Sequence, residues 1–277
     1  MKGSVIKIIL SLFLFVSMMN SYASNNVKIK DEMLLNYLVQ QGISSNEDGT
    51  YNEKELEKIT EYVAFQLPIP NELGFLKNLK KIRLWLGSTF IKTDNDTILV
   101  DLSKITNQFE SIEVNEIGHL VLFVNIDEQN QLQSLSLTGN CVLLRSKRKC
   151  SSLKYLDVRG GNMNGFDFGL FPNLKFLNCS RFEIQTLSLV DNLNIEELNC
   201  SNNQLLSLDL SQNCVLKSLD CSYNGFERFE NIILPKSIQY LNLNGNFSYG
   251  GEIRLSDFPN LKTVFIENVY VNCQERE

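Results

Sequence analysis

The chain repeats one short pattern of hydrophobic and polar residues along most of its length. Hydrophobic residues occupy positions 1, 4 and 6 of each copy, often with Asn at position 9. The nine copies begin at Leu79, Phe109, Leu132, Leu153, Leu174, Ile195, Leu216, Ile238 and Leu261. From Phe109 onward the starts lie 21 to 23 residues apart, a register that chance hydrophobic periodicity does not hold. We therefore predict a solenoid with one short strand per copy.

Alternation within each copy predicts which side of the strand is buried. Positions 4 and 6 point to one side of a strand, and positions 3, 5 and 7 point to the other. One such strand is too short to bury its hydrophobic side alone, whereas strands stacked about 4.8 Å apart share a continuous core. Each fully buried Leu or Ile then contributes about 1.5–3 kcal/mol. We expect a parallel sheet with one buried and one free face.

The phrases "LNCSNN" from Leu198 and "LDCSYN" from Leu219 resemble the leucine-rich repeat, LxxLxLxxN/CxL, of secreted bacterial proteins. The resemblance covers about residues 73 to 272. It implies an α/β repeat fold, a curved right-handed solenoid with a parallel sheet on its concave face. Short amide side chains can satisfy backbone groups at a turn and in the next coil. We expect this structural role for Asn140, Asn203, Asn224 and Asn246.

The first residues predict export. Lys2 and Lys7 precede the apolar run 8–16, and "SYA" at 21–23 offers small residues for cleavage. The alternative is a membrane anchor, but the run is shorter than the about 20 apolar residues that span a bilayer. We favour a signal peptide over residues 1–23 and no membrane-spanning segment after its removal. The mature protein would lie in a periplasm, on a cell surface or outside the cell.

Residues 24–70 do not repeat and predict a small helical module. Residues 30–42 and 52–67 carry apolar residues at helical spacing. Residues 44–55 between them resemble an EF-hand calcium loop, with Gly49 at the sharp turn. The metal ligands implied by this resemblance are Asn46, Asp48, Thr50, Asn52 and Glu55.

Two interpretations of this loop stay open, a weak calcium site and a metal-free remnant. Ser44 stands where the family has Asp, which leaves Asp48 and Glu55 as acidic ligands. Calcium affinity falls as charged oxygens are lost, so we favour the remnant and expect no cofactor. In either case we expect the module to cap the first coil of a repeat domain over residues 71–277.

The seven cysteines divide into a repeated set and single ones. Cys179, Cys200 and Cys221 occupy position 6 in successive copies, where a small buried hydrophobe is expected. Cys141 and Cys150 flank "VLLRSKRK" and are the pair best placed for a disulfide in an exported protein.

Residues that carry chemistry are scarce. His119 is the one histidine, and the sequence holds no HExxH, CxxC, phosphate loop or GxSxG. A Ser–His–Asp or Cys–His system would have to use His119, which lies beside an apolar run where a packed histidine is expected. The net charge of −6 argues against nucleic acid, whose binding needs a basic surface. We predict that the protein is not an enzyme.

A binding face is the remaining prediction. Aromatic residues and Arg dominate binding energy at protein interfaces, although single exposed aromatics are also normal on strands. The residues expected on the concave face are Trp85, Tyr155, Asp157, Arg159, Phe176, Arg181, Asp220, Tyr223, Tyr240 and Phe265. We predict an exported binding module for a protein partner of unknown identity, with a glycan as an alternative ligand. A calcium-dependent adhesive or structural surface protein is the second alternative.

Overall fold

The computed structural model contains two compact units, residues 1–60 with 72–79 and residues 61–71 with 80–277. The structure describes residues 26–65, 67, 69–87, 97–102, 107–117, 121–127, 129–161, 166–246, 252–267 and 270–272. The predicted signal peptide 1–23 and His119 lie outside the described residues, so the interpretations of these residues stay predictions. In the described part of the chain, no helix has the length and apolar character needed to cross a membrane.

The first unit contains the predicted helix over residues 30–42. Helix α2 (Glu32–Gln40) begins at Asp31, whose side chain accepts a hydrogen bond from the backbone of Leu34 at 3.0 Å, as an N-cap does. Strand β1 (Asn26–Val27) pairs antiparallel with β2 (Tyr51–Asn52). The short helix α3 (Glu53–Leu56) and the 3₁₀ turn η1 (Asn71–Phe75) follow along the chain. The first unit has a small apolar core that includes Leu34, Leu38, Leu56, Leu73 and Leu76.

The predicted helix over residues 52–67 is wrong beyond its first turn. Helix α3 ends at Leu56, and residues Glu61–Ala64 form strand β3 of the second unit. Tyr62 and Ala64 are buried while Glu61 and Val63 are half-buried, which is strand alternation. Helical and strand spacings overlap in so short an apolar run. Pairing with the next strand decides between them, because it satisfies the backbone of β3.

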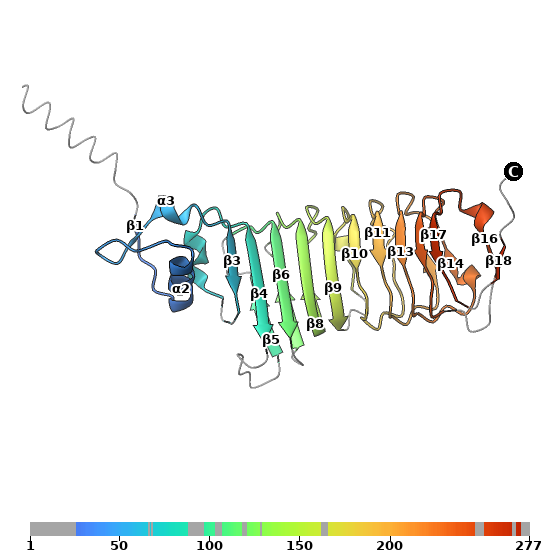
Figure 1. Ribbon diagram of the computed structural model, residues 1–277, viewed down its shortest axis with the longest axis horizontal. Helices are drawn as coiled ribbons and strands as arrows, with labels where there is room; N and C mark the ends of the chain where they lie inside the picture. The colour runs from blue at the N-terminus through green and yellow to red at the C-terminus, as the bar shows by residue number, and fades with distance from the viewer. Residues whose placement is uncertain are drawn as a thin grey trace, which may run out of the picture. The chain divides into compact units, whose positions relative to one another are not determined.

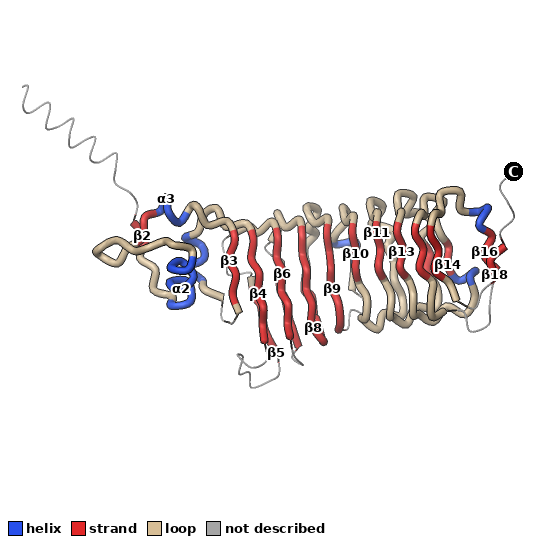
Figure 2. Tube along the Cα trace, viewed as in Figure 1, coloured by secondary structure: helices blue, strands red, loops and turns tan. Residues whose placement is uncertain are grey.

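The second unit is a row of parallel strands, seen side by side in Figure 1 and in red in Figure 2. All nine predicted copies supply a strand, and β3 adds one in front of them within the described chain. The order along the row follows the sequence: β3, β4 (Lys81–Gly87), β6 (Ser111–Ile117), β8 (Ser134–Arg145), β9 (Tyr155–Gly161), β10 (Phe176–Asn178), β11 (Glu197–Asn199), β13 (Ser218–Asp220), β15 (Tyr240–Asn242) and β17 (Thr263–Phe265). We call this row the main sheet.

Equivalent positions of successive copies lie side by side in the main sheet. Leu177 is in register with Leu156 on one side and with Leu198 on the other. The same column continues through Leu219 and Leu241, and every member is buried. Positions 4 and 6 therefore form one continuous hydrophobic core along the solenoid, as predicted.

Shorter elements cover the side opposite the main sheet. Strand β5 (Thr97–Asp101) pairs with β7 (Val121–Asn125), and β7 pairs with the second half of β8. Two further parallel pairs are β12 (Leu208–Asp209) with β14 (Ile232–Ile233), and β16 (Glu252–Arg254) with β18 (Tyr270–Asn272). The remaining turns include η2 (Phe168–Leu170), η3 (Phe229–Asn231) and η4 (Leu255–Asp257).

Three of the four position 9 asparagines, Asn203, Asn224 and Asn246, connect successive coils, as predicted, while the side chain of Asn140 lies outside the described part of the structure and its role stays a prediction. Asn203 Nδ2 donates to the carbonyl of Cys200 in its own coil at 3.0 Å and to that of Cys179 in the preceding coil at 2.9 Å. Its Oδ1 accepts from the backbone N–H groups of Phe182 and Ile184. Equivalent bonds to two coils are made by Asn224 and Asn246. Each side chain satisfies buried backbone groups that the turn leaves unpaired.

A second set of asparagines, which the repeat template did not single out, performs the same task on the return side of the coil. Asn213 Nδ2 donates to the carbonyls of Leu189 and Asn192. Asn192 Nδ2 donates in turn to the carbonyls of Phe168 and Phe171.

The cysteine column lies in the core, whereas the proposed disulfide is absent. Cys179, Cys200 and Cys221 are fully buried, and burial raises the pKa of the Cys179 thiol to about 12. Cys141 and Cys150 are both free thiols, so the predicted pair is wrong. Cys150 is buried instead, with its Sγ 3.5 Å from the carbonyl oxygen of Gln129.

Removing one asparagine amide tests its contribution to stability. We expect Asn203→Ala to lower the free energy of unfolding by about 2–5 kcal/mol, because it leaves several buried backbone groups unpaired. Urea unfolding measures this difference. Asn194→Ala is the control, since Asn194 is exposed and makes one long bond of 3.4 Å, and its loss should change stability by less than about 0.5 kcal/mol. Equal effects of the two changes would contradict the structural role.

Thiol labelling tests the buried column. Iodoacetamide should modify the exposed Cys214 in the native protein and leave Cys179, Cys200 and Cys221 unmodified until the chain unfolds, because thiolates are the reactive form. Mass spectrometry of the labelled peptides gives the extent at each site. Native labelling of Cys200 at the rate of Cys214 would place the column outside the core.

Candidate functional site

Two pairs of aromatic side chains lie on the main sheet, on the face opposite the core. We call this side, formed by positions 3, 5 and 7 of the copies, the exposed sheet face. Tyr155 and Phe176 are register partners whose rings stack at 4.4 Å with an angle of 8°. Tyr240 and Phe265 approach to 5.7 Å at 53°. Aromatic pairs of this kind gain about 0.5–1.5 kcal/mol beyond burial, so their rings are held in place before any partner binds.

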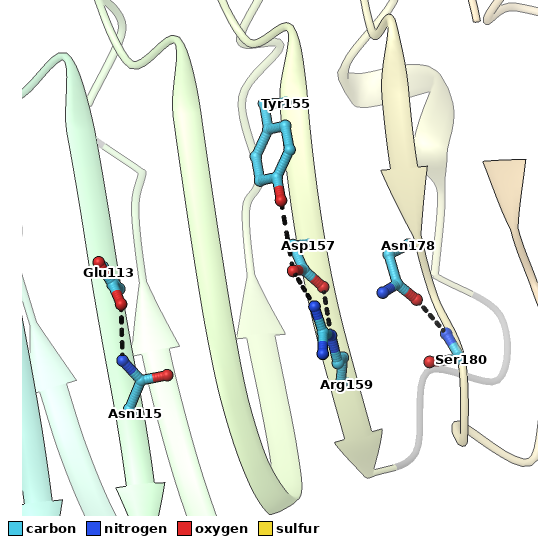
Figure 3. Close-up of polar contacts among 7 residues, drawn as sticks. All are labelled: Glu113, Asn115, Tyr155, Asp157, Arg159, Asn178 and Ser180. Carbon is cyan, nitrogen blue, oxygen red and sulfur yellow. Dashed lines mark hydrogen bonds and ion pairs between the residues drawn. The ribbon is translucent and has the colours of Figure 1, made fainter. Parts of the chain in front are cut away.

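An ion pair anchors the first aromatic pair. Arg159 donates two hydrogen bonds to Asp157, at 2.8 and 2.7 Å, and Tyr155 Oη lies 3.4 Å from the same carboxylate. Figure 3 shows the three side chains following one another along β9. Partial burial, and then the charge of Asp157, raises the pKa of Tyr155. The hydrogen bonds from Arg159 to Asp157 raise the pKa of the guanidinium. Three predicted site residues thus form one fixed cluster.

The short polar side chains at position 5 are structural to a large extent. Asn178 Oδ1 accepts from the backbone N–H of Ser180 at 3.1 Å, as Figure 3 shows. Asp220 does the same for Ser222 at 3.0 Å and also accepts from the Ser222 hydroxyl. The same contact recurs at Asn199 and Asn242. These bonds close the turn that ends each strand, and they occupy one oxygen of the predicted binding residue Asp220.

Position 8 adopts a left-handed backbone in five successive copies. The residues and φ angles are Gly160 at 78°, Arg181 at 62°, Asn202 at 55°, Tyr223 at 53° and Gly245 at 69°. Gly and Asn are suited to this conformation, whereas a longer L-residue is strained there by about 1–2 kcal/mol. Arg181 and Tyr223 are therefore the strained members of the column, and both are exposed predicted binding residues. The ring of Tyr223 lies against Gly245, where an added Cβ would come within 2.4 Å of it.

A polar hollow of about 570 Å³ lies at the end of the strands from β6 to β11. We call it the polar groove. Its lining residues are Glu116, Thr138, Gly139, Arg159, Gly160, Asn178, Ser180, Arg181, Asn199, Ser201 and Asn202. Two predicted residues, Arg159 and Arg181, belong to it.

Glu116 is the functional candidate that our interpretation of the sequence missed. It occupies position 8 of its copy and is in register with the buried Leu86 of β4. An acidic residue at position 8 between Leu86 and Gly139 of the two neighbouring copies was a usable signal. The template examined positions 1, 4, 6 and 9 and therefore passed over it.

The predicted face is divided into separate regions. Tyr155, Asp157, Arg159 and Phe176 lie together on β9 and β10, and Arg181 follows β10. A second region holds Asp220, Tyr223, Tyr240 and Phe265 on and after β13, β15 and β17. Trp85 lies on β4 and is separated from β9 by two strands, so it does not join either region.

The residues of the predicted calcium loop have partners within the first unit. Asp48 Oδ1 accepts from the backbone and hydroxyl of Thr50, at 3.0 and 2.6 Å, and these bonds lower the pKa of Asp48. Asn52 caps α3, and Glu55 pairs with Lys58. Gly49 has the left-handed φ of 75° that the sharp turn requires. No group of three or more His, Cys, Asp or Glu side chains that could hold a metal ion occurs in the described ranges. Calcium binding stays a prediction.

Solved structures identify the fold. An internalin C2 from Listeria monocytogenes has a TM-score of 0.51 at 17% identity, over 86% of this chain and 93% of that chain. A leucine-rich repeat protein from Leptospira interrogans has a TM-score of 0.51 at 17% identity, over 83% and 71%. This chain has a leucine-rich repeat fold. InlP from Listeria monocytogenes is similar at the same TM-score and 15% identity, over 87% of this chain and 68% of that chain.

No protein-family model matches the chain, and no curated protein matches it. The leucine-rich repeat assignment is therefore one of fold, carried by the parallel solenoid of the second unit and by its structural neighbours.

Replacing Arg181 tests the strain at position 8 of the leucine-rich repeat. We expect Arg181→Asn to raise the free energy of unfolding by up to about 1 kcal/mol, because Asn tolerates the left-handed backbone. The midpoint of thermal unfolding should rise by about 2–4 °C per kcal/mol for a chain of this size. Asn202→Arg, the reverse change one coil further, should lower it. A fall with Arg181→Asn would show that the Arg181 side chain stabilises the fold.

Proposed function

We propose that the protein is an exported, non-enzymatic module that binds a protein partner through the exposed sheet face. The observation that carries the proposal is the pair of prearranged aromatic clusters on a face that the core does not need. Tyr155, Tyr240 and Phe265 are exposed on this face. Each of these rings also contacts the other ring of its aromatic pair. Rigid aromatics with Arg nearby supply large contact area at small entropic cost. Export rests on the sequence of residues 1–23.

The spacing of the two clusters favours an extended contact. Phe176 and Tyr240 are three strands apart along the main sheet, or about 14 Å at the usual strand separation. Glu197 and Ser218 lie between them in the same column. A protein surface or extended segment can touch both clusters at once, whereas a monosaccharide would reach only one. Among glycans, only a chain of several sugar units therefore remains as an alternative ligand.

A triple substitution tests the binding face. We expect Tyr155→Ser, Phe176→Ser and Tyr240→Ser together to abolish recovery of proteins that the unchanged chain retains from cell-envelope or host-cell extracts. Circular dichroism verifies the fold. The control replaces three exposed hydrophobic residues outside the sheet face, Val190, Leu206 and Ile233, with Ser and should retain the same proteins. Recovery of one protein set by all three chains would reject the face.

A melting comparison tests the calcium-dependent alternative. We expect calcium and chelator to give the same midpoint, because two carboxylates at the ligand positions are a weak set for calcium. A higher midpoint in calcium that Asp48→Asn abolishes would instead support a calcium-dependent adhesive or structural protein.

A further inference from the structure

Glu116 is a buried carboxylate without a partner in the described part of the chain. Its exposed fraction is 6%, and neither of its side-chain oxygens receives a hydrogen bond there. Buried polar groups are almost always hydrogen-bonded, and a buried charge is stable only when it is paired. The side chain nevertheless belongs to the wall of the polar groove. Its two oxygens are covered, and an unpaired acid in the wall of a hollow points to a ligand that completes it.

The two groove arginines are placed to leave Glu116 unpaired. Arg159 donates two short hydrogen bonds to Asp157, and Figure 3 shows its guanidinium directed at that carboxylate. Arg181 follows β10, three strands from Glu116 on β6, or about 14 Å along the sheet. The groove therefore presents negative charge at one end and positive charge at the other.

Glycine lets the Glu116 side chain lie close to β8 at the wall of the groove. Gly139 occupies the same position of the next copy, and a Cβ built there would lie 3.3 Å from Glu116 Cβ and 3.4 Å from Oε2. Gly160, in the copy after that, also lines the groove. Glycine at both positions leaves the wall of the groove next to Glu116 without side chains.

We propose that the polar groove binds an organic cation, a Lys or Arg side chain of the protein partner, with Glu116 as its counter-ion. This inference rests on the proposed function and assigns the anchor of the same partner. Thr138, on the neighbouring strand β8, supplies a hydroxyl oxygen as an acceptor for a remaining N–H group. Arg181 at the far end faces an acidic group of the bound segment.

Other ligands fit the lining less well. A calcium ion takes six to eight oxygens and favours several carboxylates, whereas Glu116 is the single carboxylate among the groove residues. None of the lining residues is aromatic, so a sugar ring would find no face on which to stack. Donor-rich nitrogen groups match the acceptors that are present.

A lysine probe tests the site without the unknown partner. Saturation-transfer NMR on the full chain would measure binding of Nα-acetyl-L-lysine amide against Nα-acetyl-L-norleucine amide, which lacks the ammonium. We expect the lysine probe to bind at least tenfold more tightly. Glu116→Gln should remove this preference. Glu113→Gln, on the same strand, should retain it, because Glu113 is already held by Arg83 and Asn115 and does not line the groove. Equal binding of both probes, or an unchanged preference in Glu116→Gln, would overturn the proposal.

Two further measurements separate the charge of Glu116 from the fold. Gly139→Ala keeps the carboxylate and places a methyl beside it, so it should weaken the lysine probe while circular dichroism stays unchanged. Without probe, Glu116→Gln should raise the thermal midpoint, because an unpaired buried charge is removed; a fall would show that the carboxylate already has a stabilising partner. Calcium chloride should not compete with the probe at matched ionic strength, and competition lost in Glu116→Gln would assign the site to a metal ion.

The proposed function and the groove fail in different ways. If the triple serine variant loses its protein partner and the lysine probe does not bind, the exposed sheet face stands and the cationic anchor is rejected. If the probe binds through Glu116 but the triple variant keeps every partner, the groove stands as a cation site and the aromatic face is rejected.

Discussion

Register between successive coils is the constraint on which the rest of the structure depends. Each strand is only a few residues long, and it is stable because the neighbouring copy presents the same hydrophobic positions beside it. Asparagine side chains such as Asn203 reinforce this register, since one amide bonds to the backbone of two coils and satisfies groups that no regular ladder reaches. Coil stacking therefore combines hydrophobic burial with backbone hydrogen bonding between coils.

One-sided burial leaves the opposite face of the sheet free to vary. Positions 3, 5 and 7 contribute little to the core, but they are not equivalent. Position 5 is constrained, because Asn178 and Asp220 close the turns after their strands. Position 3 does not have this structural role, and three copies have an aromatic residue there, namely Tyr155, Phe176 and Tyr240. A scaffold of this kind separates the residues that stabilise the coil from those on the exposed sheet face, which can change while the coil geometry is retained.

The polar groove arises where the copies depart from one another. The early strands are long, so position 8 of β6 still points into the protein and places Glu116 there. From β10 onward the strands are short, and the same position adopts the left-handed conformation seen at Arg181. Gly139 and Gly160 lie between the copy with the buried Glu116 and the copy with the exposed Arg181. The change in strand length thus places these two charged residues at the two ends of the polar groove. Irregularity of the repeat is thus the origin of the candidate site.

The sequence by itself determined the repeat, its register, the buried columns and the coil-linking role of the position 9 asparagines. These features are set by local alternation and by a fixed period, both of which are visible in one dimension. Only the tertiary structure decided that residues 61–64 form a strand, because pairing with β4 resolves an ambiguous apolar run. The tertiary structure likewise showed that Cys141 and Cys150 are free thiols. It divided the predicted face into two regions, and it placed Glu116 and Arg181 in the lining of one groove. These outcomes depend on residues in neighbouring coils, 20 or more positions away in the chain. The stacking of the coils sets the distance between such residues, and spacing along the sequence does not reveal it.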